Sequence, residues 1–520
     1  MPTPQEKLGN ALELLKALQN QGRVAIHSKD LPRAPREILL KNGFLQQVMK
    51  GWYVPKHPDD RLGDTTPWYS SFWIFCADYF NYRFQDEWWL SPEQSISLHV
   101  GNGTVPKQIQ VRTPKGGNAA TKLLHGTSVY DLRGKIPAAG DMTLLDNLRV
   151  YKLPAALIEA VATFFPRNPT DARAALAAIP NASLLLPKLL EGSHSTIAGR
   201  LCGAFRNIGR NDTAEEIKKA MVSAGYEIRE IDPFEYKALF ELPNRTISPP
   251  AARLRLMWQE MRGNVIEHFP TAPTATFDAD CYLKHVEDVY VTDAYHSLSI
   301  EGYRVSQTLI EKVLDHKWNP DVDDIDRQQQ DALAARGYYQ AFEIVQKSIG
   351  DVLAKKKAGQ VARRDHIDWY REMFAPLVAA GILSAGSLAG YRNERVFIKG
   401  SRHVPMSGEA VTDVMPVFFD LLENEENSAA RSVLGHFLFV YIHPYMDGNG
   451  RAGRFLMNLM LASGGYPWTV IPVERRNEYM ESLERASVEQ DITPFTQFLG
   501  RLVESGMQGK AVANLPIIED

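Results

Sequence analysis

The sequence predicts a multidomain chain in which an α+β region containing a winged helix precedes a mainly α-helical bundle with a β-hairpin in the C-terminal half. Three observations lead to this prediction. The chain has 520 residues, which is enough for two or three cores of roughly 100 to 200 residues each. After Pro250 the apolar residues recur almost throughout at the i, i+3, i+4 spacing of helices. Before that proline, helical stretches alternate with short strand patterns.

Composition and charge narrow the class of protein. Hydrophobic residues make up 44% of the chain and charged residues 23%, and the formal net charge is −4. A nucleic-acid contact would therefore need a local basic face. The first residues lack the basic-then-apolar order of a signal peptide, and no apolar run reaches the ~20 residues of a membrane span. We therefore expect a cytoplasmic protein without a membrane partner.

The first 60 residues have the pattern of a winged helix, a small domain in which helices precede a hairpin. Residues 6–18 show helical apolar spacing, and residues 31–55 predict a helix, a turn at Gly43 and two strands joined at Lys50-Gly51. A phosphate-contacting face needs basic side chains, and five cluster here: Lys29, Arg33, Arg36, Lys41 and Lys50. A solvated helix surface is the alternative interpretation.

A proline-rich polar stretch predicts the main boundary. Residues 241–254 contain Pro243, Pro249 and Pro250, which we expect to interrupt any helix. The resulting organisation is a winged helix over residues 1–60, a mixed α/β domain over 61–240, a linker over 241–254 and a helical domain over 255–510.

One segment of the helical domain breaks the helical pattern. Between Tyr391 and Gly408 polar and apolar residues alternate around Val396 and Ile398, and a turn signal follows at Lys399-Gly400. This pattern predicts a β-hairpin among helices.

The stretch HPYMDGNGRAGR, residues 443–454, brings chemically useful residues close together. The apolar run after it predicts a helix that ends at Gly464-Gly465, so the stretch lies at a helix N-terminus. The free N–H groups and the positive dipole there attract anions, phosphate above all, and Gly448 and Gly450 allow the backbone to curl around one. Arg451 and Arg454 lie three residues apart on one helical face and can reach successive phosphates.

Two further side chains complete the predicted chemistry. Asp447 can hold a Mg²⁺ that bridges phosphate oxygens, because Mg²⁺ takes one or two carboxylates plus phosphates and waters. His443, with an ordinary pKa of about 6.5, suits a general base. A base, a metal carboxylate, an anion site and two arginines are what transfer from a nucleoside triphosphate to a hydroxyl requires.

Simpler explanations exist for each part alone. A lone histidine is usually structural, and DGNG alone is usually a turn. The joint pattern of eight fixed residues occurs by chance on the order of once in ten billion positions, which favours function. His436 and His443 lie seven residues apart without a third ligand, so they make a poor zinc site, and we expect His436 to lie in the core.

This stretch resembles the signature of Fic-domain proteins, with Tyr445 where phenylalanine is commoner. The segment SLSIEG, the region GYRNERVFIKGSRHVPMSGE and the tail IPVERRNEYMESLERAS add to the resemblance, which covers roughly residues 250–510. It implies a protein adenylyltransferase, which moves AMP from Mg²⁺-bound ATP to a Ser, Thr or Tyr hydroxyl of a target protein and releases pyrophosphate. The phosphotransferase branch that resembles Doc usually has Ala and Lys in place of Gly448 and Gly450, so AMP transfer is favoured.

The resemblance also implies a role for each site residue. His443 would be the base and Asp447 the Mg²⁺ ligand. The anion hole would consist of Gly448, Asn449 and Gly450, with Arg451 on the β-phosphate and Arg454 on the γ-phosphate. The hairpin residues Val396, Phe397 and Ile398 would be a flap that docks the target by strand addition.

A second segment of the Fic resemblance implies autoinhibition. In Fic proteins a helix with the pattern [Ser/Thr]-x-x-x-Glu-[Gly/Asn] blocks the γ-phosphate site, and Ser297, Glu301 and Gly302 have this spacing. A plain helix end capped by Gly302 is the alternative.

The stretches GWYVP and LSPEQSISLHVGNGTVPKQIQVRTPKGG resemble the N-terminal part of antitoxins of the AbiEi type, and the resemblance covers about the first 225 residues. The winged helix of those proteins is associated with DNA binding. DNA and a second copy of the chain are therefore candidate partners besides the target protein. Other functions stay open: transfer of another phosphate-containing group, removal of AMP from a target, or a transcription regulator or antitoxin whose Fic domain senses nucleotide.

Overall fold

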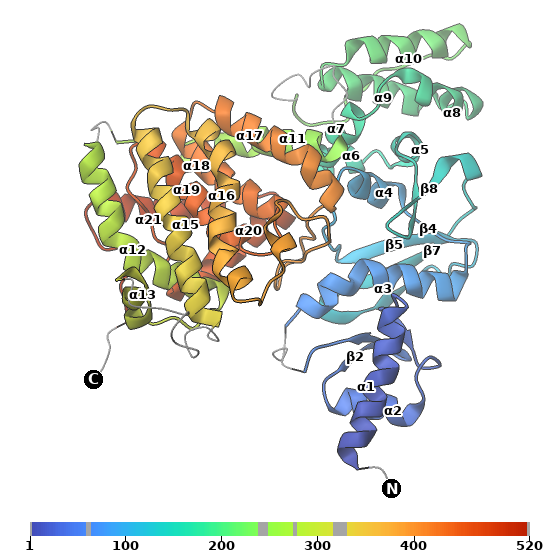
Figure 1. Cartoon of the computed structure of the whole chain (residues 1–520). Coiled ribbons are helices and arrows are strands. Elements are labelled where there is room, and N and C mark those ends of the chain that lie inside the picture. Colours follow the sequence, from blue (N-terminus) through green and yellow to red (C-terminus); the bar gives the residue numbers. More distant parts are fainter. Residues whose placement is uncertain (1–2, 59–63, 238–247, 274–277, 316–329, 517–520) are drawn as a thin grey trace. The chain divides into compact units, whose positions relative to one another are not determined.

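The computed structural model describes residues 3–58, 64–237, 248–273, 278–315 and 330–516. These residues are mainly helical and include three small sheets (Figure 1). The chain divides into two compact units, which are described separately. Unit 1 consists of residues 1–253 and 397–405, and unit 2 of residues 254–396 and 406–520. Within the described ranges, no helix combines the length and hydropathy that a membrane crossing requires.

The first 55 residues of unit 1 form two helices and a three-stranded antiparallel sheet in the order β1-β3-β2. Leu15, Ile26 and Leu39 lie in their shared core. The elements are α1 (Pro4–Asn20), β1 (Ile26–His27), α2 (Arg33–Lys41), β2 (Leu45–Met49) and β3 (Trp52–Pro55). The turn glycines Gly43 and Gly51 both have positive φ angles, which favour glycine. The winged-helix assignment for this segment stays a prediction.

The rest of unit 1 combines a mixed sheet with helices. The sheet has the order β4-β5-β7-β6, in which only β5 and β7 run parallel, and its strands are β4 (Trp89–Leu90), β5 (Gln108–Thr113), β6 (Ala119–Lys122) and β7 (Ser128–Arg133). A separate antiparallel pair is β8 (Met142–Leu145) and β9 (Leu148–Tyr151). Helix α3 (Thr66–Phe84) contributes many aromatic residues to the core, among them Trp68, Phe72 and Phe80.

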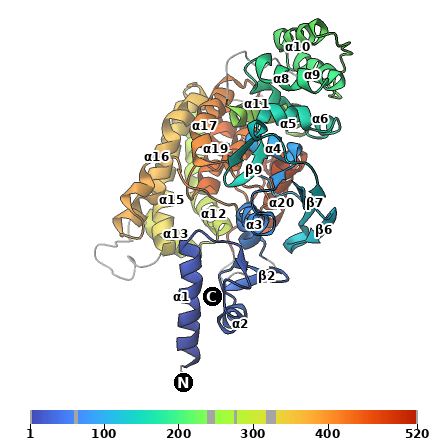
Figure 2. The same ribbon diagram turned by 90° about the vertical axis from the view of Figure 1, so that its right-hand side faces the viewer.

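Short helices complete unit 1, and α8, α9 and α10 pack together (Figure 2). The helices are α4 (Pro92–His99), α5 (Leu153–Glu159), α6 (Phe164–Arg167), α7 (Pro169–Ala177), α8 (Leu186–Glu191), α9 (Ser195–Asn207) and α10 (Asn211–Ser223).

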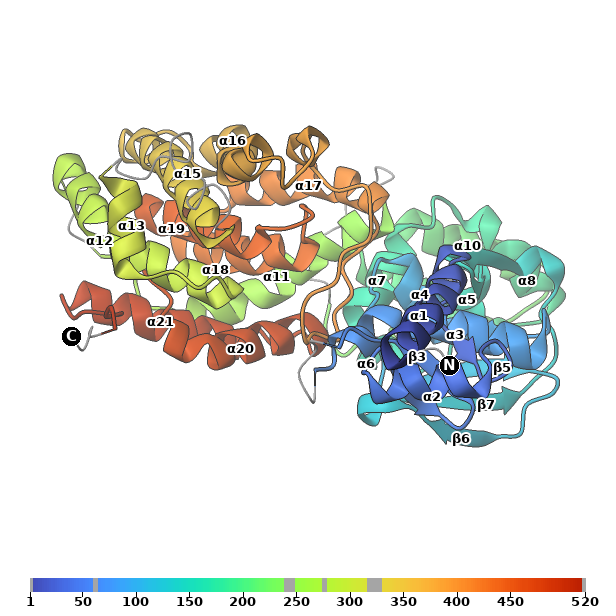
Figure 3. The same cartoon turned by 60° about the horizontal axis from the view of Figure 1, so that its bottom comes forward.

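Unit 2 is helical in the part that the structure describes. Its helices are α11 (Pro249–His268, which begins in unit 1), α12 (Ala279–Glu301), α13 (Gln307–Leu314), α15 (Gln330–Leu353), α16 (Ala358–Ala379), α17 (Gly408–Asn424), α18 (Ser428–Ile442), α19 (Asn449–Ser463), α20 (Arg476–Val488) and α21 (Thr493–Met507). Helix α19 is buried over nearly its whole length because it packs against α12, α15, α16 and α18. Helix α18 also contacts α17, α20 and α21 (Figure 3). The helix that begins directly after HPYMDG is therefore the central helix of this bundle.

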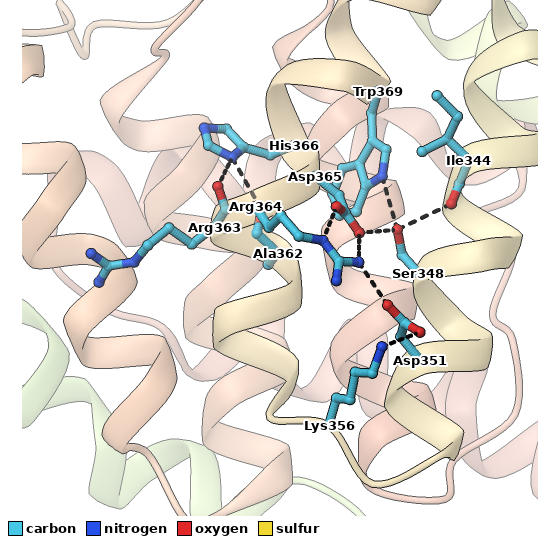
Figure 4. A network of polar contacts seen from close by, with 10 residues as sticks. All are labelled: Ile344, Ser348, Asp351, Lys356, Ala362, Arg363, Arg364, Asp365, His366 and Trp369. Atoms are coloured by element: carbon cyan, nitrogen blue, oxygen red, sulfur yellow. Dashed lines mark hydrogen bonds and ion pairs between the residues drawn. The ribbon is translucent and has the colours of Figure 1, made fainter.

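A polar network fixes α15 against α16 (Figure 4). Ser348 Oγ lies 2.7 Å from Asp365 Oδ2, and Trp369 Nε1 donates to Ser348 Oγ over 3.3 Å. Arg364 bridges Asp365 and Asp351, the second over 2.7 Å. Helix α16 also carries Tyr370, whose ring stacks on that of Tyr445, and Phe374, whose ring lies beside Gly448, so this helix borders the loop between α18 and α19.

Two expectations from the sequence were wrong in this structure. Pro249 and Pro250 were expected to interrupt any helix, but they form the first turn of α11. A proline is tolerated there because the N–H that it lacks would have no intrahelical partner. Residues 241–247 of the expected linker lie outside the described residues.

The second correction concerns the β-hairpin. The segment does turn at Lys399-Gly400, where the Ser401 N–H donates to the Ile398 carbonyl over 3.1 Å. Its two arms do not pair as strands, and within the described ranges every strand precedes Lys152. The returning arm bonds to Val105 instead: the Val105 N–H donates to the Arg402 carbonyl over 2.8 Å, and the Arg402 guanidinium donates to the Val105 carbonyl. The Arg402 carbonyl, which a hairpin could use, is therefore engaged by Val105 instead.

The three expected flap residues are divided between the units. Val396 is buried in unit 2, whereas Phe397 and Ile398 belong to unit 1. Phe397 is 36% exposed and Ile398 is partly buried.

Candidate active site

The loop HPYMDG connects α18 to α19 and has a left-handed residue at each end. His443 caps the C-terminus of α18 with φ 54°, and Gly448 caps the N-terminus of α19 with φ 75°. A side chain at Gly448 would be strained by this φ, and its Cβ would also lie 2.7 Å from the ring of Phe374. The Asn449 side chain closes the loop, since it accepts from the Tyr445 N–H and donates to the Tyr445 carbonyl, both over 2.9 Å.

The imidazole of His443 is oriented as a proton acceptor. Nδ1 lies 3.1 Å from the Val440 carbonyl oxygen. Because a carbonyl can only accept, the hydrogen lies on Nδ1, and Nε2 keeps its lone pair. Burial, together with the charge of Arg392, lowers the pKa of His443 to about 4, although the hydrogen bond to Val440 and the charges of Glu301 and Asp447 oppose the shift. The ring is therefore neutral near pH 7.

The N-terminus of α19 has the features of an anion site. No side chain caps this helix end in the described part of the chain, so its first N–H groups remain available. The carboxylate of Asp447 borders this helix end. It accepts from the Gly448 N–H over 2.6 Å, and its side chain is 68% exposed. One exposed carboxylate beside phosphate-binding N–H groups fits the few protein ligands that Mg²⁺ takes in nucleotide sites.

Arg451 is a buried cation held between two aromatic rings. Its Cζ lies 5.1 Å from the centre of the Tyr303 ring and 5.0 Å from that of Phe374. Among the described residues, Nε and Nη1 of Arg451 have no hydrogen-bond partner. Burying such donors without an acceptor is costly, so this geometry suits an anion that binds at the start of α19.

Arg454 is engaged by the end of α12. Its Nε donates to Ser297 Oγ and its Nη2 to the Ser297 carbonyl, both over 2.9 Å. Nη2 also lies 2.7 Å from Oε1 of Glu301. Burial opposes both charges, yet the pairing raises the pKa of Arg454, and the charges of Arg454 and Arg451 lower that of Glu301. Both partners are therefore ionised near pH 7.

The Glu301 carboxylate also lies against the first turn of α19. A Cβ built on Gly450 would be 2.2 Å from Glu301 Oε1. Gly302 caps α12 in the left-handed conformation, with φ 97°. Both interpretations of the segment SLSIEG therefore apply to its geometry, because it is a glycine-capped helix end and it also pairs with Arg454.

Tyr445 takes the place where phenylalanine is commoner in the resembling family. Its ring is buried and stacks on Tyr370 with a 4.0 Å separation of ring centres. Its hydroxyl lies 3.4 Å from the His366 carbonyl oxygen, which supplies the partner that the extra hydroxyl needs. His436 lies in the core, as expected, with Nε2 2.7 Å from the hydroxyl oxygen of Tyr479.

Sequence reasoning missed three residues of this site, namely Tyr303, Phe374 and Arg392. Tyr303 follows directly on Gly302, but no motif distinguished it. Phe374 and Arg392 come from α16 and the segment after it, far from the loop in sequence. Their proximity to the loop is a result of packing alone.

The five basic residues near the N-terminus divide into two groups. Arg33 pairs with Glu37 over 2.7 Å, and Arg36 donates to the Ser28 carbonyl over 2.7 Å and lies over the ring of Tyr53. Arg36 therefore serves local structure, whereas Arg33 is exposed and forms a surface ion pair. The three exposed residues that remain are Lys29, Lys41 and Lys50.

The comparison with known families adds to this geometry. Residues 361–461 match the model of the Fic/DOC family. This segment is a Fic domain. The match covers nearly all of α16, the whole of α17 and α18, the loop after α18 and nearly all of α19.

Similar proteins extend the match beyond the Fic domain. The protein adenylyltransferase Fic of Drosophila willistoni is 28% identical over 238 residues, which are 45% of this chain and 44% of that protein. The protein of the same name from Nematostella vectensis is 30% identical over 228 residues, which are 42% of this chain and 48% of that protein. The chain thus spans about half the length of these relatives.

Solved structures with Fic domains are also similar. A Fic-domain signalling protein from Bacteroides thetaiotaomicron aligns over 50% of this chain and 99% of its own, with 18% identity and a TM-score of 0.36. A Fic family protein from Desulfovibrio desulfuricans aligns over 52% of this chain and 77% of its own, with 22% identity and a TM-score of 0.35.

Proposed function

We propose that the protein is an autoinhibited protein adenylyltransferase, which transfers AMP from Mg²⁺-bound ATP to a Ser, Thr or Tyr hydroxyl of a target protein or of its own chain. The observation that carries this proposal is the arrangement at the start of α19. A neutral histidine, an uncapped helix N-terminus and two buried arginines meet within twelve residues. The names of the relatives, protein adenylyltransferase Fic, support the same reaction.

The N–H groups at the start of α19 bind the α- and β-phosphates, with Gly448, Asn449 and Gly450 as the anion hole. The side chain of Asn449 is engaged with Tyr445, so its contribution comes from the backbone. Arg451 binds the β-phosphate. Arg454, once released from Glu301, binds the γ-phosphate.

Mg²⁺ held by Asp447 would neutralise part of the charge on the phosphate oxygens. Nε2 of His443 accepts the proton of the target hydroxyl as its oxygen forms a bond to the α-phosphorus. The bond from that phosphorus to the bridging oxygen breaks, and pyrophosphate leaves. The product carries AMP on the hydroxyl oxygen.

Glu301 is the inhibitory residue in this proposal, together with Ser297 and Gly302 of the same helix end. Its carboxylate occupies Arg454 and contacts Gly450. Like charge repels a γ-phosphate, so ATP adopts a pose unsuited to in-line attack on the α-phosphorus. Activation requires that this helix end move or that the charge be removed.

The remaining parts of the proposal concern partners. The segment with Val396, Phe397 and Ile398 aligns the target backbone as an extended chain. The exposed lysines Lys29, Lys41 and Lys50 contact DNA phosphates.

The deciding experiment is incubation of the purified full chain with α-labelled ATP and Mg²⁺, alone and with candidate target proteins. Covalent label on a hydroxyl side chain, identified by mass spectrometry as AMP, supports the proposal. Another adduct, or loss of AMP from a modified target, would indicate a different transferred group or the reverse reaction. Nucleotide binding without any covalent change in the Glu301→Gly variant would indicate a sensor instead.

A further inference from the structure

Arg392 is a buried arginine whose partners in the described structure are all backbone carbonyls. The residue is 3% exposed, and within the described ranges its guanidinium donates to carbonyls and pairs with no carboxylate. Burial lowers its pKa to about 10. A buried charge normally has an acidic partner. Because four backbone carbonyls take the place of such a partner here, we infer that the guanidinium fixes the positions of the backbone segments around it.

Two of these contacts lie at the end of α18. Arg392 Nε donates to the His443 carbonyl over 2.7 Å, and Nη2 lies 3.4 Å from the Ile442 carbonyl oxygen. The Arg392 backbone N–H donates to the Pro444 carbonyl over 2.9 Å. One residue therefore binds three successive carbonyls at the end of α18 and directly after it, where helix carbonyls have no intrahelical partners.

The conformation at His443 requires such support. A histidine with φ 54° is in the left-handed region, which side chains with a Cβ adopt only at a cost. The same turn directs the imidazole toward Val440 and leaves Nε2 with the lone pair. Bonds that hold the carbonyls on both sides of this turn hold the direction of the ring.

The other two contacts flank the segment 397–405, one before it and one after it in the sequence. Nη1 donates to the Glu394 carbonyl over 2.9 Å, and Nη2 donates to the Met406 carbonyl over 2.6 Å. Arg392 therefore ties three pieces of backbone in unit 2 to one another: the His443 turn, the chain that leads into this segment and the chain that returns from it.

We propose that Arg392 is a positioning residue for AMP transfer, which sets the direction of the His443 imidazole and ties it to the base of the segment 397–405. The inference rests on the proposed function. Arg392 acts through His443 and does not itself contact the nucleotide.

The test uses full-length Glu301→Gly protein as the parent, with Arg392→Lys and Arg392→Met added separately. Lysine keeps the charge but offers a single ammonium group that cannot reach carbonyls in the fork geometry. We expect both variants to lower kcat for AMP transfer by about a hundredfold, as a small misplacement of a reacting group does. The Kd for Mg²⁺-bound ATP should stay within twofold of the parent, since the anion site is intact.

Arg431→Met is the matched control. Arg431 lies in the first turn of the same helix α18, donates to the Glu425 carbonyl over 2.6 Å, and also has its pKa lowered by burial. We expect this variant to lose thermal stability and to keep kcat. Parental kcat in both Arg392 variants would overturn the proposal, and so would a loss of nucleotide affinity that matches the loss of kcat.

A second measurement separates this proposal from the proposed function. Nitrogen-15 NMR of labelled histidine, with the His443 signal identified by its loss in His443→Ala, reports which ring nitrogen carries the hydrogen. The parent should show hydrogen on Nδ1, and Arg392→Lys should show a mixture of the two tautomers. If the parent transfers no AMP, the proposed function fails and this spectrum still decides the role of Arg392. An unchanged tautomer in both variants would contradict the role.

Discussion

Nη2 of Arg454 lies 2.7 Å from Oε1 of Glu301, although the two residues are 153 positions apart in the chain. The Glu301 side chain is 27% exposed and that of Arg454 is 5% exposed. This pairing places an acidic group where the proposed reaction needs a γ-phosphate. Its strength follows from limited solvent screening around the guanidinium.

Glu301→Gly should self-label with AMP much faster than the wild type. The change removes both the ion pair with Arg454 and the carboxylate beside Gly450, and each ~1.4 kcal/mol released corresponds to about a tenfold gain in rate. The measurement is the initial rate of incorporation from α-labelled ATP. Glu287→Gly, an exposed glutamate on the same helix α12, is the control and should show no gain. An equal gain in both variants would point to loosening of α12 in general.

His443→Ala should bind Mg²⁺-bound ATP but lose AMP transfer, because only the proton acceptor is removed. We expect a loss of about 10² to 10⁴ in kcat relative to Glu301→Gly. The pH profile of the parent provides a second measurement. The base must be neutral, so the rate falls as pH drops through its pKa. Because burial lowers that pKa to about 4, the decline should begin well below pH 6. Undiminished labelling in the double variant Glu301→Gly, His443→Ala would exclude the assigned base.

Asp447→Asn should weaken nucleotide binding only in the presence of Mg²⁺. The amide keeps the size of the side chain but lacks the charge that a divalent ion requires. Calorimetric titration with ATP, with Mg²⁺ and with excess chelator, measures both affinities. Equal affinities for variant and wild type in Mg²⁺ would remove Asp447 from the metal site, whereas equal losses in both buffers would indicate damage to the loop.

Gly450→Ala should be destabilising in a way that depends on Glu301. The new Cβ would lie 2.2 Å from Glu301 Oε1, and overpacking of this kind typically costs about 1–3 kcal/mol. Thermal unfolding of the wild type, both single variants and the double variant forms a cycle. The cost of Gly450→Ala should be smaller when Glu301 is already Gly. A cost that is the same in both backgrounds would show that the two residues do not interact.

The full chain should bind DNA weakly, with an affinity that falls steeply as salt rises, if the N-terminal lysines contact phosphates. Replacing Lys29, Lys41 and Lys50 together with Gln should reduce both the affinity and the salt dependence. Arg33→Gln is the control, because Arg33 pairs with Glu37. Fluorescence anisotropy at several salt concentrations measures the DNA affinity of each protein and its salt dependence. Binding that does not respond to salt, or none at all, would favour a protein partner for this region.

Local features of the fold followed well from the sequence. Apolar spacing predicted the helices of unit 2, and the glycines of the loop predicted where α19 begins, because both signals depend on residues within one or two turns. The prolines at 249 and 250 were misjudged because a proline disrupts a helix only at interior positions, whereas these two lie in the first turn of α11. The hairpin was misjudged because Val105, nearly 300 residues away, binds the backbone carbonyl and the guanidinium of Arg402.

The residue types of the candidate site could be read from the sequence, since one short loop and the helix that follows it place His443, Asp447 and the two arginines. How these groups are held became clear from the packing of distant helices. Tyr303 and Phe374 enclose Arg451, Glu301 occupies Arg454, and Arg392 binds the carbonyls around His443. The physical reason is that a spacing rule describes neighbours along one helix. The burial and partners of each charge depend on which distant helices pack around α19, and these contacts set the pKa of His443 and the state of Arg454.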